Sequence, residues 1–396
     1  MKKKVSILIT VIITSLIGFT VLSFYLKNKE SNVENNTEFK FNLTYSDNYA
    51  FRVVDNRLYF WDTLNNTYNI FCSQPNCKHQ TLEENPKSIC TAVPVVPEYN
   101  YYYAFIGHDR LYSIYSLKVN EFLIYESDID GSNKKLFYTA DVSMNNLCYP
   151  LFRQNKLFFL AEKYDIQKAL NDDFSCNFSL CMIDFSDRSF KEIKKFDNLN
   201  QLYIFPNIYL NDNLLYYQYA YYDDLSINEN EHDSDVQENS YIFFESVNID
   251  SGKVRKIFNF FNEDFYAWNC QDNNAIYNTY NKKKKLSKVY LMNLSSEKSE
   301  PLFEEENDVS YIFKLDNLIL YEASDSNHRN ICVYDIKSKD KKVHKLESDE
   351  YLYFYGKSGD NMLMQFQKGD KNKMGSIPIK DLFELNFNNT TYVADQ

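Results

Sequence analysis

Glycine is scarce in this 396-residue sequence, which contains only 8 glycine residues. Phosphate-binding loops and nucleophile elbows need glycine, because their backbones approach a ligand closely or take positive φ angles. The sequence contains no GxGxxG, no GxxxxGKS/T and no GxSxG pattern. It therefore lacks the usual sequence support for a nucleotide-binding loop or an α/β-hydrolase nucleophile.

Basic residues are in deficit as well, with 43 Lys and Arg against 55 Asp and Glu and a net charge of -12. Proteins that bind nucleic acid concentrate positive charge against the phosphates. We therefore expect no nucleic-acid partner. An acidic surface of this kind favours cations, neutral glycans or basic protein patches.

Charge is absent altogether from Val5 to Leu26, which follow three lysines at positions 2–4. Twenty-two residues in a helix span roughly the 30 Å hydrocarbon core of a bilayer. We predict that residues 1–26 form a single transmembrane helix with the lysines in the cytoplasm and the rest of the chain outside the cell membrane. The alternative is a cleaved signal peptide and a secreted domain, although no Ala occurs before position 50 to form the usual cleavage site. No Cys precedes Cys72, so lipid attachment beside the apolar segment is excluded.

Residues 27–44 are polar and rich in Asn, and are predicted to be a flexible linker. The second half of this segment, around Phe39 to Leu43, could instead form a first strand. Residues 45–396 are then the extracytoplasmic domain.

Aromatic residues are abundant, with 34 Tyr and 31 Phe, and both residue types favour β-strands. A short phrase recurs along the domain: an Asp or Asn, a basic or amide residue, and then an apolar run. Its copies are separated by 53, 46, 57, 61, 43 and 44 residues. The seven copies begin at Asn56, Asp109, Asn155, Asp212, Asn273, Asp316 and Asp360.

The phrase predicts a polar turn followed by a strand, and later strands in each unit alternate apolar and polar residues. Examples of such alternation are Leu123–Gly131 and Ile331–Ile336. A unit of about four strands repeated seven times is typical of a β-propeller. The predicted fold is therefore all-β, a seven-bladed β-propeller, with six or eight blades also compatible. A β-sandwich is the second choice, because it has no fixed long period.

The units are unequal. The first has room for only one hairpin before the Cys-rich segment, so it is predicted to be incomplete. Because propellers commonly close by mixing strands from both chain ends, the tail at Thr390–Val393 or the strand near Phe39 could complete it. The longest unit contains an acidic insertion, Asp223–Glu238, which is predicted to be a solvated loop.

Three cysteines and a histidine form the most informative cluster: Cys72, Cys77, His79 and Cys90. Three thiolates and one imidazole can complete the tetrahedral shell of a structural Zn²⁺. A disulfide from Cys72 or Cys77 to Cys90 is the alternative in an exported protein, with free thiols a third possibility. Four protein ligands leave no open position on the metal, which argues against a catalytic zinc.

Other cysteines are less informative. Cys176 and Cys181 could form a bridge within one hairpin, whereas Cys181 and Cys332 occupy alternating strand positions and could be core residues.

The cluster and the segments around it also resemble those of a known protein family. The segments Leu58–Asp62 and Ile70–Cys72, Pro75-x-Cys77-x-His79 and Cys90-x-Ala92 together resemble a family of exported Gram-positive β-propellers of unknown function. Many of these are membrane-tethered or lipoproteins, related to TolB-like and low-density-lipoprotein-receptor-type propellers. The resemblance implies a surface binding propeller without assigned chemistry. Two departures are the missing lipobox Cys and a scrambled receptor-type Tyr-Trp-Thr-Asp phrase, so neither lipoprotein status nor a count of six blades is carried over.

No catalytic constellation can be assembled from spacing alone, so we predict a binding module rather than an enzyme, with a protein or glycan ligand on the propeller face. A carbohydrate-active or other hydrolase or lyase on the same scaffold is the alternative, because propeller enzymes gather their residues from several blades. The Tyr-rich segments Glu98–Tyr103 and Tyr216–Tyr222 could offer stacking platforms for a ligand. Their alternative role is packing between blades.

Overall fold

The computed structural model describes residues 38–40, 43–45, 49–54, 56–62, 65, 67–94, 100–145, 150–164, 176–196, 202–222, 240–261, 264–271, 273–281, 283–324, 328–369 and 371–392. The predicted anchor, residues 1–26, and the acidic insertion at 223–238 lie outside these residues. Within the described part of the chain, no helix is long and apolar enough to cross a membrane.

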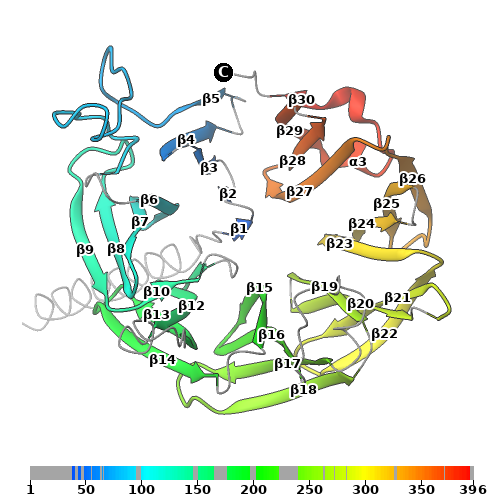
Figure 1. Cartoon of the computed structure of the whole chain (residues 1–396). Helices are drawn as coiled ribbons and strands as arrows, with labels where there is room; N and C mark the ends of the chain where they lie inside the picture. Colours follow the sequence, from blue (N-terminus) through cyan, green and yellow to red (C-terminus); the bar gives the residue numbers. More distant parts are fainter. Residues whose placement is uncertain are drawn as a thin grey trace, which may run out of the picture. The chain divides into compact units, whose positions relative to one another are not determined.

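The described residues form seven antiparallel sheets arranged around a central axis, which confirms the predicted all-β, seven-bladed propeller (Figure 1). Blade 1 contains β1 (Glu38–Lys40), β2 (Leu43–Tyr45), β3 (Tyr49–Val54), β4 (Arg57–Asp62) and β5 (Thr67–Ile70). Blade 2 contains β6 (Asn100–Gly107), β7 (Arg110–Lys118), β8 (Glu121–Ser127) and β9 (Lys135–Ala140). Blade 3 contains β10 (Ser143–Met144), β11 (Leu151–Arg153), β12 (Lys156–Tyr164), β13 (Cys176–Asp184) and β14 (Ser189–Lys195).

The remaining four blades follow in sequence order. Blade 4 contains β15 (Leu202–Asn211), β16 (Leu214–Tyr222), β17 (Ser240–Asn248) and β18 (Val254–Phe261). Blade 5 contains β19 (Asp264–Gln271), β20 (Asn274–Asn281), β21 (Leu286–Asn293) and β22 (Lys298–Glu305). Blade 6 contains β23 (Asp308–Leu315), β24 (Leu318–Ser324), β25 (Arg329–Asp335) and β26 (Lys341–Lys345). Blade 7 contains β27 (Glu350–Ser358), β28 (Asn361–Lys368), β29 (Lys371–Pro378) and β30 (Thr391–Tyr392), with the short α3 (Ile379–Leu382) and η2 (Phe387–Asn389) before β30.

The repeated phrase marks the same place in every blade, a two-residue hairpin turn such as the one between Leu315 and Leu318. In six blades the leading residue of the phrase has a positive φ, which Asp and Asn tolerate better than other non-glycine residues. In the seventh, Gly359 takes this conformation directly before Asp360. The phrase therefore recurs because the turn demands a left-handed residue. The six residues and their φ angles are Asn56 (60°), Asp109 (55°), Asn155 (59°), Asp212 (50°), Asn273 (61°) and Asp316 (50°).

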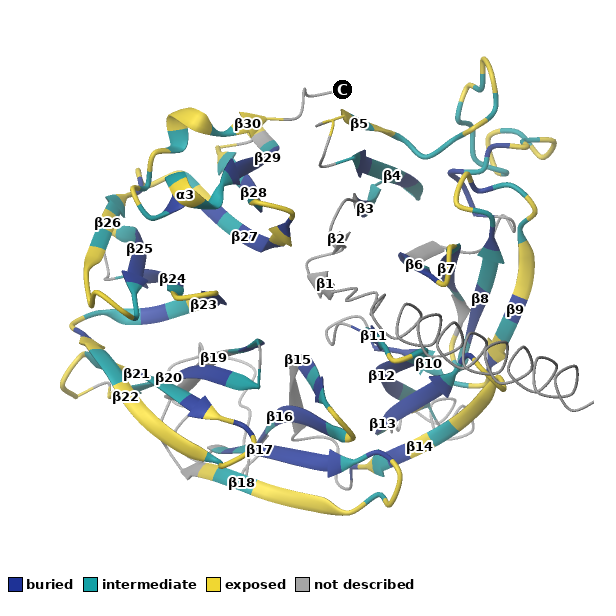
Figure 2. Cartoon of the chain, turned by 180° about the vertical axis from the view of Figure 1, so that it is seen from behind, coloured by how far each residue is buried: buried dark blue, intermediate teal, exposed yellow. Residues whose placement is uncertain are grey.

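The core lies between neighbouring sheets. Between blades 2 and 3, for example, Phe105 and Phe122 pack in one fully buried cluster with Leu157 and Phe159. The outer strands are more exposed, as β18 and β22 show in Figure 2. These strands also carry lysines, and β22 includes Pro301, features that discourage pairing with another chain at a free edge.

Blade 1 is incomplete at its outer side, as predicted. Among the described residues no fourth strand follows β5, and the Cys-rich segment comes directly after it. This segment returns to the blade, where the backbone N–H of Leu58 donates to the carbonyl of Ala92 (2.8 Å). On the inner side, β1 and β2 extend the sheet toward the axis (Figure 1). A strand therefore does form near Phe39, but it does not supply the missing outer strand of blade 1.

The ring closes without a strand shared between the chain ends, as far as the described residues go. The tail strand β30 pairs with β29 inside blade 7, so the idea that the tail completes blade 1 is wrong. Instead, side chains of blades 1 and 7 meet in one buried cluster that includes Trp61 and Tyr355. On the inner side, β2 contacts both β6 of blade 2 and β27 of blade 7. Closure therefore rests on side-chain packing and on the inner hairpin.

Candidate metal centre and aromatic surface

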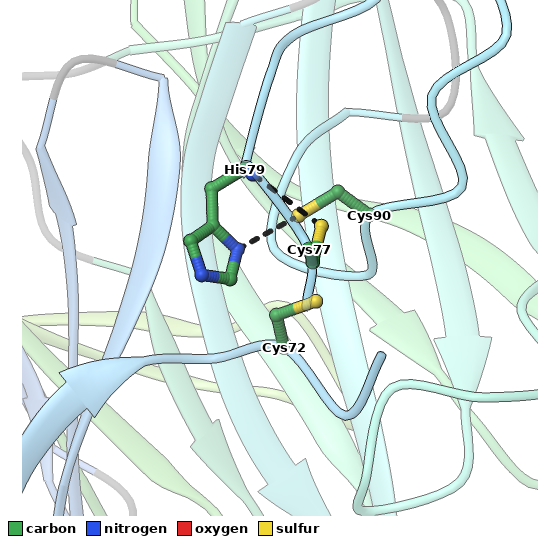
Figure 3. Close-up of side chains that lie close together, drawn as sticks. All are labelled: Cys72, Cys77, His79 and Cys90. Carbon is green, nitrogen blue, oxygen red and sulfur yellow. Dashed lines mark hydrogen bonds between the residues drawn. The ribbon is translucent and has the colours of Figure 1, made fainter. Parts of the chain in front are cut away.

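The four predicted ligands come together in the connection between blades 1 and 2. The ligand atoms of Cys72, Cys77, His79 and Cys90 all lie within 4.8 Å of one another (Figure 3). His79 Nδ1 is 3.5 Å from Cys90 Sγ, and the backbone N–H of His79 is 3.3 Å from Cys77 Sγ. Two positive φ angles, at Asn76 (57°) and His79 (52°), fold the chain tightly enough to bring these side chains together.

This geometry fits a tetrahedral metal. Zinc bonds of about 2.3 Å to sulfur and about 2.0 Å to nitrogen place neighbouring ligand atoms roughly 3.5–3.8 Å apart. The group of Cys72, Cys77, His79 and Cys90 could therefore hold a metal such as zinc. The three thiols are free in the structure, whereas a disulfide would need two sulfur atoms about 2.05 Å apart.

The local environment shifts the pKa values of two of the thiols in opposite directions. Burial raises the pKa of the Cys90 thiol to about 12, and the neighbouring Cys72 adds to the effect. Burial also acts to raise the pKa of Cys72, but the backbone N–H groups of Gln74 and Thr91 and the thiols of Cys90 and Cys77 outweigh it and hold the pKa below its ordinary value. Cys72 therefore loses its proton more readily than Cys90, and a bound cation would favour the thiolate form of both.

Hydrogen bonds tie this segment to blade 1. Arg57, the first residue of β4, donates from Nε to the carbonyl of His79 (2.9 Å). Its Nη2 also reaches both carboxylate oxygens of Glu84, at 3.1 and 2.9 Å. Glu84 in turn accepts from the backbone N–H of Thr81 (2.8 Å).

The same segment is also held against blade 2. Lys134 Nζ donates to the carbonyl of Thr91 (3.1 Å) and lies 3.2 Å from the hydroxyl of Tyr115. Gly131, in the turn between β8 and β9, has the side chains of Thr91 and Phe71 directly against it. The candidate metal centre thus stands at the junction of the first two blades.

The other described cysteines lie apart from this group. Cys176 and Cys181 belong to the same strand, β13, so the predicted bridge within a hairpin is wrong. Five residues along a strand span about 17 Å, whereas a disulfide needs Cα atoms roughly 4.4–6.8 Å apart. Cys181, Cys270 and Cys332 are buried, which agrees with a role in the core for the first and last. Cys148 lies outside the described residues.

The structure does not support the possible aromatic platforms at the tyrosines that it describes. Tyr103 and Tyr217 are buried between blades, at 2% and 0% exposure. Tyr219 is partly buried and packs on Phe196 and Phe243, with ring centroids 5.4 and 4.9 Å away. The side chains of Tyr101 and Tyr221 lie outside the described residues. For the described members, the alternative role of packing between blades holds.

Exposed aromatic rings occur elsewhere, at the junction of blades 6 and 7. We call Tyr311, Tyr351 and Tyr353, together with Arg329 and Glu322, the tyrosine surface. Tyr311 is 45% exposed and Tyr351 is 36% exposed. The sequence offered one signal, the alternation Tyr351-x-Tyr353-x-Tyr355 in an inner strand, but it could not show that Tyr355 turns inward while Tyr351 stays exposed.

The tyrosine surface combines stacked rings with a fixed ion pair. The rings of Tyr351 and Tyr353 are nearly parallel (11°) with centroids 6.4 Å apart, and Tyr311 meets Tyr353 edge-on at 5.6 Å and 80°. Arg329 lies over Tyr351, with Cζ 4.1 Å from the ring centroid. Its Nε and Nη2 donate to the two carboxylate oxygens of Glu322 at 2.7 and 2.5 Å. These contacts hold the guanidinium in place.

Many solved structures are similar to the chain, and three of them illustrate the likeness. An oligogalacturonate lyase in complex with manganese is 11% identical, with a TM-score of 0.50 over 82% of this chain and 86% of the lyase. The β-propeller domain of the Trilobed protease from Pyrococcus furiosus, described as having an open velcro topology, is 9% identical with a TM-score of 0.50 over 91% and 97%. A prolyl endopeptidase is 6% identical with a TM-score of 0.57 over 91% of this chain and 49% of its own, so the chain spans about half its length.

These identities show a shared propeller fold and nothing finer. No family model and no curated protein matches the chain. The resemblance to exported Gram-positive propellers therefore stays a prediction.

Proposed function

We propose that this propeller is an extracytoplasmic, membrane-tethered binding module. The observation that carries the proposal is the tyrosine surface, where aromatic rings remain exposed on the inner strands of two blades. Exposed tyrosines are suited to recognition, because each combines a large apolar face with a hydroxyl and loses little entropy on binding. The fused sheets of a propeller would hold such a surface rigid.

We also propose that a structural Zn²⁺ occupies the cluster of Cys72, Cys77, His79 and Cys90. Four protein ligands saturate a tetrahedral ion, so the ion would support the fold and would not activate water. Its place is informative, because blade 1 lacks the outer strand that the other blades possess among the described residues. The metal-bound segment would take the place of that strand at the junction with blade 2.

Metal analysis tests the zinc site. The full chain, purified in mild detergent without chelator, should contain about one Zn²⁺ per molecule, and His79→Ala and Cys90→Ser should lose it. Cys176→Ser is the matched control and should retain zinc, because Cys176 lies on β13, away from the cluster. A zinc-free chain whose peptide masses show Cys72 or Cys77 bonded to Cys90 would establish the disulfide instead.

Two measurements test the binding function. Protease added to intact cells should remove the propeller while cytoplasmic proteins survive; protection of the propeller would contradict an extracytoplasmic location. The full chain in detergent, immobilised through a C-terminal tag, should bind saturably to either the glycan or the protein fraction of cell-envelope material. Failure to bind either fraction would overturn the proposed function.

A further inference from the structure

We propose that the tyrosine surface is a binding site for a neutral saccharide. This inference rests on the proposed function and names its ligand class. It is carried by the arrangement of the three rings, by the conformation of Tyr311 and by the charge balance of the surface.

The rings form a platform with a wall. Tyr351 and Tyr353 come from β27 of blade 7 and lie nearly parallel, while Tyr311 comes from β23 of blade 6 and stands at 80° to Tyr353. The C–H faces of a sugar ring pack on such aromatic faces, and the phenol hydroxyls can hydrogen-bond to the sugar hydroxyls. A site shared by two blades would also fix the orientation of a bound ring.

Tyr311 is held in an unusual conformation. Its φ is +48°, and it lies in a bulge of β23, where the register with β24 shifts between Ser310 and Phe313. A left-handed conformation costs conformational free energy for a bulky side chain, and such strain concentrates at functional sites. Burial of the ring does not offset the cost, because Tyr311 remains 45% exposed. The bulge instead aims an exposed ring beside Tyr353.

The charges of the surface cancel. Glu322 is only 4% exposed, and it holds Arg329 through two hydrogen bonds. A carboxylate ligand would have to compete with this buried partner for the guanidinium, and the whole chain is acidic. A neutral saccharide does not have to displace Glu322 from Arg329. Its hydroxyl oxygens can accept hydrogen bonds from guanidinium N–H groups already fixed over Tyr351.

The neighbouring aliphatic residues do not enlarge the surface. Val309, Ile312 and Leu352 lie on the same inner strands and are buried, at 0%, 3% and 3% exposure. A protein partner usually docks on a patch with an apolar core, whereas here the aromatic rings are accompanied by polar and charged groups. The chemistry of the surface therefore favours a sugar over a peptide.

Calorimetric titration of the full chain in detergent tests the site. The probes are neutral oligosaccharides, namely gluco-, manno- and N-acetylglucosamine oligomers, with galacturonate oligomers as the anionic comparison. At least one neutral series should bind, and the galacturonate oligomers should bind at least 10-fold more weakly. Tyr351→Ala should weaken the neutral ligand at least 10-fold. Tyr392→Ala is the matched control and should leave binding unchanged, because Tyr392 is a similarly exposed tyrosine (38%) on β30.

A second variant separates binding from folding. Tyr311→Gly removes the ring and supplies the residue that best tolerates a positive φ. It should weaken the neutral ligand at least 10-fold while the melting temperature stays equal or rises. Binding of a neutral saccharide that Tyr351→Ala and Tyr311→Gly leave unchanged would overturn the site. Binding to envelope protein, with none to any saccharide, would overturn the saccharide proposal and leave the binding function intact.

Discussion

Trp61 of the first blade and Tyr355 of the last blade lie in the same buried cluster, at 0% and 3% exposure. This cluster joins the two ends of the ring, which share no strand among the described residues. Propellers that exchange a strand between their ends are held by backbone hydrogen bonds at the closure. In this chain the corresponding stability has to come from side-chain packing.

Truncation of Trp61 should therefore open or weaken the closure. We expect Trp61→Ala to lower the free energy of unfolding by about 3–5 kcal/mol, the usual cost of removing a large buried aromatic side chain. A denaturant titration monitored by circular dichroism measures this change in the free energy of unfolding. Val343→Ala is the control and should change stability by less than about 0.5 kcal/mol, because Val343 is 53% exposed on β26. Equal effects of the two substitutions would show that the closure cluster is not important for stability.

Gly131 and Gly252 give a matched test of the contact between the metal-binding segment and blade 2. Both have positive φ (81° and 69°), so either Gly→Ala change should cost about 1–2 kcal/mol through the backbone. An added Cβ at Gly131 would also meet Thr91 Cβ at 2.8 Å and Phe71 Cε1 at 3.0 Å, whereas at Gly252 the nearest atom is 3.9 Å away. We expect Gly131→Ala to be the more destabilising in thermal unfolding. A larger loss for Gly252→Ala would contradict the tight contact.

The ion pair of Lys194 and Glu245 joins blades 3 and 4. Lys194 Nζ is 2.6 Å from Glu245 Oε2, and the hydroxyls of Tyr217 and Tyr219 donate to the same carboxylate at 2.8 and 3.1 Å. Lys194→Met leaves a buried carboxylate without its cation, and should cost about 3–5 kcal/mol in denaturant titration. Adding Glu245→Gln should recover most of that loss.

An exposed pair provides the comparison. Lys288 and Glu304 are 2.6 Å apart, but their side chains are 46% and 56% exposed. Lys288→Met should therefore lower the free energy of unfolding far less than Lys194→Met does, because solvent already screens the exposed pair. If it costs as much as Lys194→Met, burial does not determine the contribution of these pairs.

Buried tyrosines predict sensitivity to alkaline pH. Burial raises the pKa of Tyr112 and of Tyr216 to about 12, with Glu126 adding to the effect at Tyr112 and Glu297 at Tyr216. Below pH 10 the phenols are protonated in both the folded and the unfolded chain, so their contribution to the free energy of unfolding is fully present. Between about pH 10 and 12 the unfolded chain loses these protons first, and stability falls by about 2–3 kcal/mol for each group.

A rapid jump to pH 11 measures this effect through phenolate absorbance near 295 nm. Exposed tyrosines should ionise at once, and the buried ones should follow only as the chain unfolds. Ionisation of all 34 tyrosines in the fast phase would contradict the predicted protection.

Much of the fold could be predicted from local features of the sequence. In six of the seven repeated phrases the leading Asp or Asn recurs because a two-residue turn needs a left-handed residue, and the spacing of these turns predicts the blades. The grouping of Cys72, Cys77 and His79 is similarly local, since one short turn brings them together, and Cys90 joins after a single loop.

The sequence by itself determined the turns and the strands that follow them, because each depends on residues within a few positions of one another, and seven copies of the phrase predicted seven blades. Only the tertiary structure decided which faces meet. Packing between sheets buries Tyr103 and Tyr217 but leaves Tyr311 and Tyr351 exposed, although all four stand in similar aromatic strands. It also decided that the ring closes through Trp61 and Tyr355, because side chains from the two ends of the chain become neighbours only once seven sheets surround one axis.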